Sequence, residues 1–448
     1  MHRRIPVWLF LLVILLGIVF MVGFGWTVRH VAQGHTFGKI GEIAILIAEY
    51  PSLLKKTLYQ VGVLKEDVTK QLHADHKPIH PQWIKNEFPD IDGFKRRGAL
   101  PPGVINDSGY LLLSIYDHER NQAVVKLIRI NDDSTVHEWV PHIAQARKSH
   151  EMIHHPILLD DGGLLFHWYR TSLQKIDVCA QDVWSIDSHD FHHSNEVGPD
   201  GNFWIPTVIN PSPLHQKYGK YKDDGIAKVS QDGKLLSVLS VADILVRHGY
   251  RAIAFGSGEY HWNNIHLNDI EPALYSTKYW DKGDILVSMR HPSTVFLYRP
   301  RTDEILWLKT GPWIAQHDAD FLGESKVVIY GNDHVRGKKE KPFIDGINNV
   351  YVYDFSTDTV LLPYKSSMTK ADVRTEYEGL QEILPNGDVF IEEQTRGRLL
   401  RLSYDEIVWE YTYRISDIYL GMPKWSRYLT EDQVNHILPV IDANDCAN

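Results

Sequence analysis

The chain has 448 residues, of which 43% are hydrophobic and 23% charged, so its composition is that of a packed globular protein and excludes a disordered chain. The formal net charge of −10 argues against a nucleic-acid binder held by phosphate neutralisation. Two cysteines exclude a disulfide-dense scaffold and any cysteine-based zinc or iron–sulfur centre, whereas 24 histidines are an unusually large number.

The N-terminus contains an apolar run that is long enough to cross a membrane. Residues 5–28 carry no charge and can span a hydrocarbon core of about 30 Å. Arg3 and Arg4 precede the run, so the positive-inside rule leaves the N-terminus in the cytoplasm. The alternative is a cleaved signal peptide, but the run is longer than a usual h-region and no clear small-x-small site follows it. We therefore predict a single-pass anchor at residues 1–28 and an extracytoplasmic, periplasmic remainder.

Apolar residues continue at helical spacing after this segment, and Pro51 is well placed to begin a second helix after Tyr50. The pattern predicts a helical stalk over residues 29–75 that acts as a spacer or joins copies into a homo-oligomer. The remaining residues, 76–448, form the predicted main domain. Its two cysteines, Cys179 and Cys446, either form one long-range disulfide in an oxidising compartment or stay as two inert thiols.

From about residue 100 the sequence consists of short β-type runs separated by turn signals. The turns are Asp161-Gly162, Asp200-Gly201, Asp232-Gly233 and Asn386-Gly387. A repeat is also visible: an acidic residue followed by apolar residues and tryptophan recurs at Trp184, Trp307 and Trp409, with Trp139 in a degenerate copy and Val238 and Leu362 in the tryptophan position of two more. These positions are 45, 54, 69, 55 and 47 residues apart. Six such units predict an all-β, six-bladed β-propeller.

Histidines recur at the first residue of the apolar strand before several of these turns. They are His155, His193, His266 and His317, and Gly379 takes the position in the last unit. The innermost strands of a propeller begin at the same end of its central channel. A single histidine at a strand start is usually a hydrogen-bonded structural residue, but four in comparable positions favour a shared site.

Three stretches, Phe191–Asn202, His266–Val295 and Gln316–Leu322, resemble the bacterial arylsulfotransferases. The resemblance covers about residues 100–415 and includes a Ser-x-Arg-His motif at Ser288–His291, which follows a hairpin that is longer here than in the family. It implies a six-bladed periplasmic propeller that transfers a sulfuryl group from a phenolic sulfate ester to an acceptor phenol without a nucleotide donor. It also implies that His317 accepts the sulfuryl group, forming a sulfohistidine.

The chemistry needs cations on the sulfuryl oxygens, an acid for the leaving phenolate and a nucleophile in line. We expect His266 to act as acid and then as base, Arg290 to hold the sulfuryl oxygens with its planar fork, and His193 to add a donor. Strand alternation predicts that only one of His192 and His193 points inwards. Substrate contacts are expected from His192, His155, His291 and Asn268, with no metal and no cofactor.

Other interpretations of these residues predict different functions. His150-Glu-Met-Ile-His154 matches the H-E-x-x-H metallopeptidase pattern, but Pro156 follows and the segment is predicted to enter a strand. His189, His192 and His193 do not converge on one metal if they lie along a strand. Residues 336–341 form a basic run, either a solvated hairpin tip or a lid that attracts anionic esters. The alternative function for the whole domain is a non-catalytic binding or assembly platform.

Overall fold

The structure is a computed structural model that describes residues 7–32, 39–40, 43–44, 47, 82–96, 107–142, 152–168, 171–214, 219–336, 342–444 and 446. Two compact units are present, Met1–Lys77 and Pro78–Asn448. Most of the predicted stalk lies outside the described residues.

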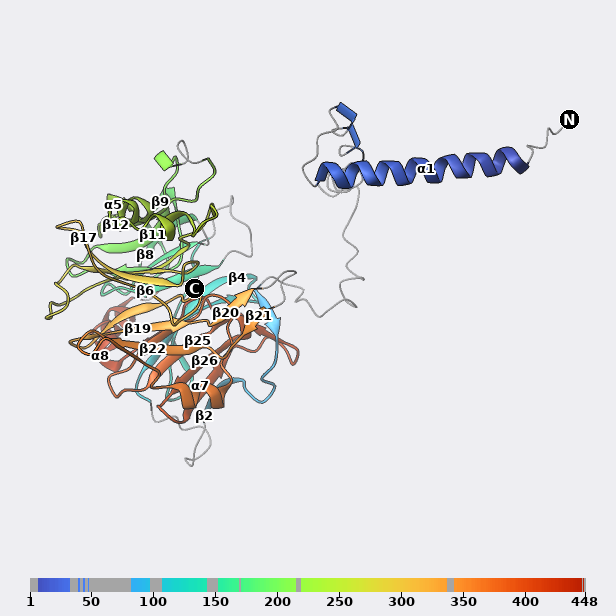
Figure 1. Ribbon diagram of the computed structural model, residues 1–448. Helices are drawn as coiled ribbons and strands as arrows, with labels where there is room; N and C mark the ends of the chain where they lie inside the picture. The colour runs from blue at the N-terminus through green and yellow to red at the C-terminus, as the bar shows by residue number, and fades with distance from the viewer. Residues whose placement is uncertain are drawn as a thin grey trace. The chain divides into compact units, whose positions relative to one another are not determined.

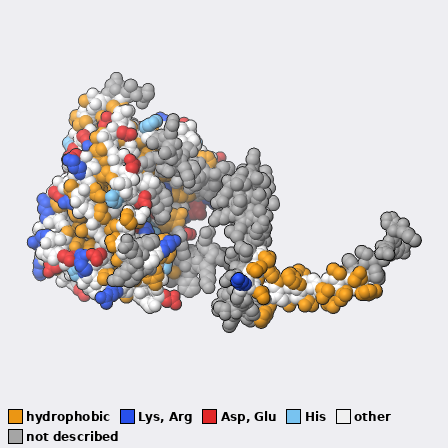
Figure 2. Space-filling model, turned by 90° about the horizontal axis from the view of Figure 1, so that it is seen from above, with side chains coloured by type: hydrophobic (Ala, Val, Ile, Leu, Met, Phe, Trp, Pro, Cys, Tyr) orange, Lys and Arg blue, Asp and Glu red, His pale blue; other side chains and the backbone are white. Residues whose placement is uncertain are grey.

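The first unit contains a long apolar helix, α1 (Val7–Ala32). Its Val7–Val28 segment has a mean hydropathy of 3.0 and is long enough to cross a membrane. Figure 2 shows hydrophobic side chains along this helix. By length and composition, such a helix near the N-terminus is either a membrane anchor or a signal sequence.

The second unit is built from antiparallel sheets that follow one another in chain order (Figure 1). Sheet 1 has the order β29 (Arg427–Leu429), β3 (Tyr110–Asp117), β4 (Gln122–Arg129) and β5 (Ser134–Trp139). Sheet 2 has eight strands: β13 (Leu235–Ser240), β12 (Asp224–Val229), β11 (Phe203–Val208), β9 (Asp182–Phe191), β8 (Thr171–Ile176), β7 (Leu164–Trp168) and β6 (Ile153–Leu158), with β10 (Glu196–Val197) beside β11.

Three further sheets complete the arrangement. Sheet 3 comprises β14 (Leu267–Pro272), β15 (Ile285–Met289), β16 (Thr294–Arg299) and β17 (Glu304–Thr310). Sheet 4 comprises β18 (Ala319–Leu322), β19 (Lys326–Gly331), β22 (Asn349–Asp354) and β23 (Thr359–Leu361). Sheet 5 comprises β24 (Leu380–Ile383), β25 (Val389–Glu393), β26 (Arg398–Leu402), β27 (Ile407–Thr412) and β2 (Gly93–Arg96).

Smaller elements connect these sheets. Two strand pairs are β1 (Trp83–Lys85) with β28 (Tyr419–Gly421), and β20 (His334–Arg336) with β21 (Pro342–Asp345). The short helices are α5 (Val241–Arg247), α6 (Arg251–Phe255), α7 (Lys365–Ala371), η2 (Gln394–Arg396), α8 (Glu431–Asn435) and α9 (Leu438–Ala443).

Apolar side chains join each sheet to the next, which explains why β3 is buried on both faces. One buried cluster joins sheets 1 and 2 and another joins sheets 2 and 3. Two more join sheet 3 to sheet 4 and sheet 4 to sheet 5. The ring closes because Phe390 of sheet 5 packs with Leu113 of sheet 1, and because β29 near the C-terminus pairs with β3. The fold is therefore all-β and propeller-like.

The sequence repeat corresponds to one strand position in these sheets. Trp139, Trp184, Trp307 and Trp409 lie in β5, β9, β17 and β27, and Val238 lies in β13. Leu362 directly follows β23. The predicted turns also form: Gly162, Gly201, Gly233 and Gly387 all have positive φ, the backbone conformation that favours glycine. The repeat therefore marks the fourth strand counted from β29, β6, β14 and β24, which is an edge strand in sheets 1 and 3 but not in sheets 2 and 5.

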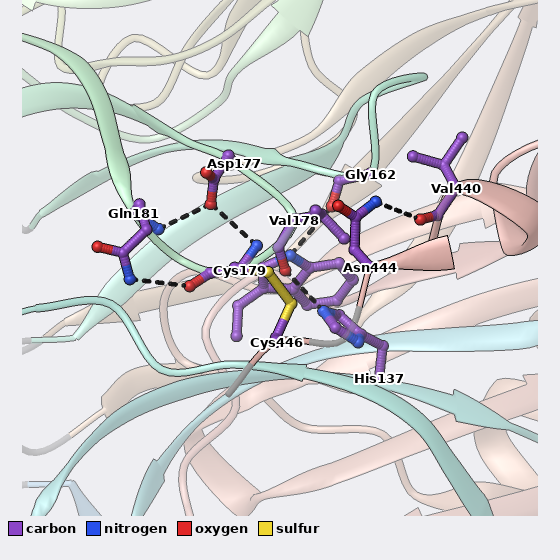
Figure 3. Close-up of a disulfide and its surroundings, with 10 residues drawn as sticks. His137, Gly162, Asp177, Val178, Cys179, Gln181, Val440, Asn444 and Cys446 are labelled. Atoms are coloured by element: carbon purple, nitrogen blue, oxygen red, sulfur yellow. Dashed lines mark hydrogen bonds between the residues drawn. A yellow bond between two sulfur atoms is a disulfide. The ribbon is translucent and has the colours of Figure 1, made fainter. Parts of the chain in front are cut away.

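Cys179 and Cys446 form a disulfide with a Cα–Cα distance of 5.2 Å, which settles the alternative left open above (Figure 3). Cys179 lies in the turn between β8 and β9, and the Asp177 carboxylate accepts its N–H. Cys446 follows α9, whose Ile441 packs in the cluster between sheets 1 and 2. The bond links positions 267 residues apart and holds the C-terminal helices on the ring.

We expect the Cys446→Ser variant to lose about 2–4 kcal/mol in free energy of unfolding, because its C-terminal segment is no longer covalently linked to the ring. Its unfolding temperature should fall accordingly. Thermal unfolding followed by circular dichroism measures the loss. Cys179→Ser is the matched control and should lose the same amount. The double variant should lose no more than either single one; additive losses would show that the cysteines stabilise the fold separately.

Candidate functional site

Histidines from three sheets meet at one end of the inner strands. We call His192, His193, His266, His291 and His317 the histidine cluster. The His193 ring centroid lies 5.6 Å from that of His266 and 6.1 Å from that of His317, and His266 lies 4.4 Å from His291. His266 precedes β14 and His317 precedes β18, so strand starts from successive sheets bring these residues together.

His317 is 2% exposed and is held in one tautomer. The Nδ2 group of Asn332 donates to the carbonyls of Thr375 and Glu378, at 3.1 and 2.8 Å, and this fixes the amide with its oxygen towards His317. His317 Nδ1–H therefore donates to Asn332 Oδ1 at 2.6 Å. The lone pair is on Nε2, where it accepts the backbone N–H of Glu378 at 2.9 Å. Such a neutral ring has a nucleophilic nitrogen on the side facing residue 378.

Arg290 brings a fixed positive charge to the cluster. Its backbone N–H donates to the His266 carbonyl at 3.0 Å, directly after β15 ends at Met289. The Arg290 charge lowers the pKa of His317, second only to burial, and it also lowers the pKa of His266 and His291. Arg290 thus stands close to three of the five histidines.

His192 and His193 do not follow the alternation of a strand. His193 has a φ of +62°, so its side chain does not point opposite to that of its neighbour. The two Nδ1 atoms are 2.7 Å apart. His193 faces the His266 and His317 rings, whereas Nε2 of His192 lies 3.4 Å from the Asp224 carboxylate. Only His193 of the pair faces the His266 and His317 rings, and both residues follow the end of β9 at Phe191 instead of lying in a strand.

A second cation, Lys222, belongs to the cluster and was missed in the sequence. Its Nζ lies 2.6 Å from Asp224 Oδ1, and its charge lowers the pKa of His192, His193, His266 and His291. Asp224 also accepts the N–H of Leu267 at 3.2 Å, next to His266. Lys222 lies in the loop before β12.

Asn332, which orients the His317 ring, directly follows β19. The run of polar residues after an apolar strand at Gly331-Asn332-Asp333 is the signal that points to Asn332.

Burial keeps the cluster neutral at physiological pH. Desolvation, aided by Arg290, lowers the pKa of His317 to about 3. Desolvation and the Lys222 charge lower the pKa of His192 to about 4 and that of His266 further still. Burial and the other histidines hold the pKa of His193 well below its usual range. An anion bound among these groups would oppose the two cations and raise these pKa values.

Two of the predicted site residues make their hydrogen bonds to residues other than the five clustered histidines. His155 is buried, accepts the Asn195 N–H at Nδ1 (2.7 Å) and contacts Arg427. Asn268 is fully buried and donates to the Gln316 carbonyl at 3.0 Å. His291, by contrast, lies on the exposed rim beside His266. His154 of the metallopeptidase pattern lies in strand β6, while His150, Glu151 and residues 337–341 of the basic run lie outside the described residues.

The described residues thus form an all-β, propeller-like ring with buried histidines, Arg290 and Lys222 gathered at its inner strand starts, an arrangement typical of a functional site. The sequence profile of the arylsulfotransferase (ASST) family matches residues 155–414, more than half of the chain. The chain belongs to the arylsulfotransferase family. No curated protein matches the sequence.

Two solved structures are similar to this chain in fold. One is a protein of unknown function from Bacteroides caccae, with 14% identity and a TM-score of 0.48, covering 72% of this chain and all of the other. The second is the WD40 domain of Neurospora crassa Pan2, with 12% identity and a TM-score of 0.40, covering 78% of this chain and 94% of the other.

Proposed function

We propose that the protein is a membrane-anchored aryl sulfotransferase that moves a sulfuryl group from a phenolic sulfate ester to an acceptor phenol through a sulfohistidine at His317. The observation that supports this most is the meeting of His317, His266 and Arg290, which come from three separate strand ends. Membership of the arylsulfotransferase family agrees with it. A binding platform has no need to place a tautomer-fixed histidine beside an arginine.

The first half-reaction forms a bond from His317 Nε2 to sulfur and breaks the sulfur–aryl oxygen bond. His266, protonated when the anionic ester is bound, gives its proton to the departing phenolate oxygen. The acceptor phenol then returns a proton to His266 as its oxygen attacks sulfur, which releases His317. Arg290 and Lys222 offset the negative charge on the sulfuryl oxygens during both steps.

The Glu378 peptide affects the proposed reaction because its N–H donates a hydrogen bond to the lone pair of His317 Nε2. The ester must displace this hydrogen bond before Nε2 can attack. Once sulfur is bound to Nε2, the same N–H would be released from the ring nitrogen and available to donate to a sulfuryl oxygen. Residue 378 has a φ of +56° and Gly379 has a φ of +86°. The backbone here therefore has the left-handed conformation, which residues other than glycine rarely adopt.

We further infer that the ring has six blades. Sheet 2 contains one buried cluster within itself, in which Leu165 and Leu173 pack against Ile205 and Ala227. This cluster resembles those between the other sheets and would divide sheet 2 into two blades joined through the ten-residue strand β9. The domain limits 1–28, 29–75 and 76–448 remain part of this proposal, as does self-association through the stalk.

The proposed activity is tested by incubating the full chain in detergent with 4-nitrophenyl sulfate, with and without an added phenol. Release of 4-nitrophenol that depends on the phenol, together with a sulfated phenol by mass spectrometry, is the expected result. Release without a phenol requirement would indicate hydrolysis instead of transfer. No release with any of a panel of aryl sulfates would favour the binding platform.

We expect the ring domain to lie outside the cytoplasm because Arg3 and Arg4 precede the charge-free run. Protease added to intact spheroplasts should therefore degrade the domain while a cytoplasmic marker protein survives. Carbonate extraction should leave the protein in the membrane pellet if α1 is uncleaved. A domain protected from the protease would reverse the proposed topology.

The low pKa of His317 predicts activity in acid. A histidine with an ordinary pKa of about 6.5 would be some 97% protonated at pH 5, and a nucleophile would lose about 30-fold. His317, with a pKa of about 3, stays neutral at pH 5, so protonation of the nucleophile should cost almost nothing between pH 7 and 5. The measurement is kcat/KM for 4-nitrophenyl sulfate in samples quenched into base. An acid limb centred near pH 6.5 would contradict the assignment.

A further inference from the structure

The inner strands also line an acidic cavity. Its volume is about 360 Å³. The acidic residues in its wall come from the inner strands of successive sheets, and we call them the channel carboxylates: Glu196 of β10, Glu271 of β14, Asp318 and Asp320 at β18, and Glu382 of β24. Asp269 is two residues before Glu271 on β14, and its carboxylate lies close to those of Asp318 and Asp320.

The described residues that line this cavity include one permanent cation, Arg427. Its Nη2 lies 2.9 Å from the Glu196 carboxylate and 3.0 Å from His155 Nδ1. Among the channel carboxylates it therefore pairs directly with Glu196. His155 has its pKa held well below the usual range by burial and by Arg427, and it is neutral at pH 7. Five lining carboxylates thus share one arginine, which leaves the cavity with excess negative charge whenever they ionise.

The carboxylate pKa values reflect this imbalance. Burial, reinforced by the neighbouring carboxylates, raises the pKa of Asp269 to about 7. The same two causes hold the pKa values of Glu271, Asp318 and Asp320 well above their ordinary range. Groups of this kind become stable in a folded protein either by taking up protons or by binding a cation.

Three of these acids converge closely enough to share one ion. Asp269, Asp318 and Asp320 each present a carboxylate oxygen, and these atoms lie within 4.8 Å of one another. Oxygen ligands lie about 2.3–2.6 Å from a calcium ion, so two of them on opposite sides are about 5 Å apart. The spacing of the three oxygens therefore matches one coordination shell.

Gln381 contacts two of these acids, one through its backbone and one through its side-chain amide. Gln381 is 2% exposed and lines the cavity. Its backbone N–H donates to Asp318 Oδ2 at 2.8 Å and its Nε2 donates to Asp320 Oδ2. Its Oε1, although buried, has no hydrogen-bond partner among the described residues. A buried amide oxygen beside carboxylates would be satisfied by a cation rather than by another acceptor.

We propose that Asp269, Asp318, Asp320 and the Gln381 amide oxygen bind one calcium ion in the central cavity of the ring. The donors are all oxygens, which favour a hard cation, and the absence of nitrogen or sulfur among these four donors argues against zinc. Calcium accepts irregular shells of six to eight oxygens, so waters in the cavity can complete the set, whereas magnesium demands a near-ideal octahedron. The inference departs from the expectation of no metal, and it does not depend on sulfuryl transfer.

The ion would link three sheets. Asp269 belongs to sheet 3 and Asp320 to sheet 4, while Gln381 comes from sheet 5. Their existing cross-links are hydrogen bonds: the Ala319 N–H donates to Asp269 and the Gln381 N–H to Asp318. A calcium ion at this point would add direct bonds between successive inner strands and neutralise their charge.

The test uses the full chain in detergent, stripped with EDTA and then given calcium chloride. Calorimetric titration should show one calcium site per chain, and the unfolding temperature should rise by several degrees in 1 mM calcium relative to EDTA. Magnesium at the same concentration should produce a much smaller rise. Absence of a calcium-dependent shift together with absence of binding heat would overturn the proposal, and so would tighter binding of magnesium than of calcium.

Two variants that each remove one carboxylate distinguish direct coordination of calcium from general attraction by the negative charge of the cavity. Asp320→Asn should weaken calcium binding by a factor on the order of 10². Glu382→Gln is the matched control, because it removes one carboxylate from the same cavity outside the three converging acids, and it should weaken binding less than tenfold. Equal losses in the two variants would show a diffuse field and overturn the coordination site.

The unfolding temperatures of the metal-free proteins show whether a loss of calcium binding results from misfolding. Asp320→Asn removes one of several repelling charges, so in EDTA it should unfold at or above the wild-type temperature, while calcium no longer raises that temperature. If this variant does not fold, Gln381→Met provides the second measurement. It keeps the length of the side chain, removes the amide oxygen and should weaken calcium binding about tenfold; unchanged binding would overturn the role of Gln381.

Discussion

Replacing His317 with alanine is expected to abolish both the sulfuryl adduct and the cleavage of the donor ester. The expected loss in kcat is on the order of 10³ or more, because the ring nitrogen forms the only covalent bond to sulfur in the proposed reaction. Asn332 would remain in place, held by Thr375 and Glu378, so the cavity left by the imidazole would be bounded by the same backbone. The reaction would lose its nucleophile while the surrounding structure stays intact.

Mass spectrometry of the intact protein and of its peptides checks this result. The protein is exposed briefly to an aryl sulfate and quenched at alkaline pH, since an N-sulfonated imidazole is labile in acid. Wild type should gain one sulfuryl group on the peptide that contains His317, and its steady-state kinetics should be ping-pong. His436→Ala, which removes an exposed histidine on the helical C-terminal segment, is the control and should behave as wild type. An adduct on another residue, or full activity without His317, would refute the nucleophile.

Replacing Arg290 with lysine should slow transfer by a factor on the order of 10² while leaving the fold unchanged. Lysine keeps the positive charge but lacks the planar fork that can hold two sulfuryl oxygens at once. If that hold acts mainly in the transition state, kcat falls more than KM rises. The pKa of His317 should stay low, because the charge that helps to lower it is retained.

Stopped-flow measurement of the first half-reaction separates these effects. The adduct should still form in the Arg290→Lys protein, but more slowly, and the acid side of the pH profile should match that of wild type. Arg301→Lys is the control because Arg301 is 64% exposed on the turn between β16 and β17. An unchanged kcat in Arg290→Lys would restrict Arg290 to a structural role.

The sequence predicted the strands and the meeting of the histidines because both follow from short-range periodicity. The acidic-apolar-tryptophan repeat places Trp139, Trp184 and Trp307 in the same strand position of different sheets. The strand starts then predict that His266 and His317 meet, although 51 residues separate them, and their rings both contact that of His193. Such a prediction requires only that the inner strands share one end of the ring.

The sequence did not predict features that depend on loops or on single backbone angles. Lys222 reaches the cluster from a loop before β12, and its position depends on the whole path of that loop. His193 departs from strand alternation because of its positive φ, which no nearby glycine signals. His155 was expected to begin its strand, but β6 begins at Ile153, and its ring contacts Asn195 and Arg427 beside the acidic cavity.

The acidic cavity depends on a different kind of sequence signal. Asp269 and Glu271 are two residues apart on β14, and Asp318 and Asp320 are two apart at β18, a spacing that puts each pair on one face of its strand. The signal was therefore present in the sequence. The two pairs become one ligand set only where neighbouring inner strands bring them together, and the spacing within a single strand does not show this.

Because β29 completes sheet 1 from the far end of the chain, the ring cannot close until translation has passed residue 429. The first sheet to be synthesised must wait for its innermost strand, with the inner edge of β3 unpaired in the meantime. The same late segment brings Arg427, the cation beside Glu196. A chain that stops before it would keep the cavity carboxylates and lack the arginine that balances them, so premature termination should produce a protein that is both open at one edge and electrostatically strained at its centre.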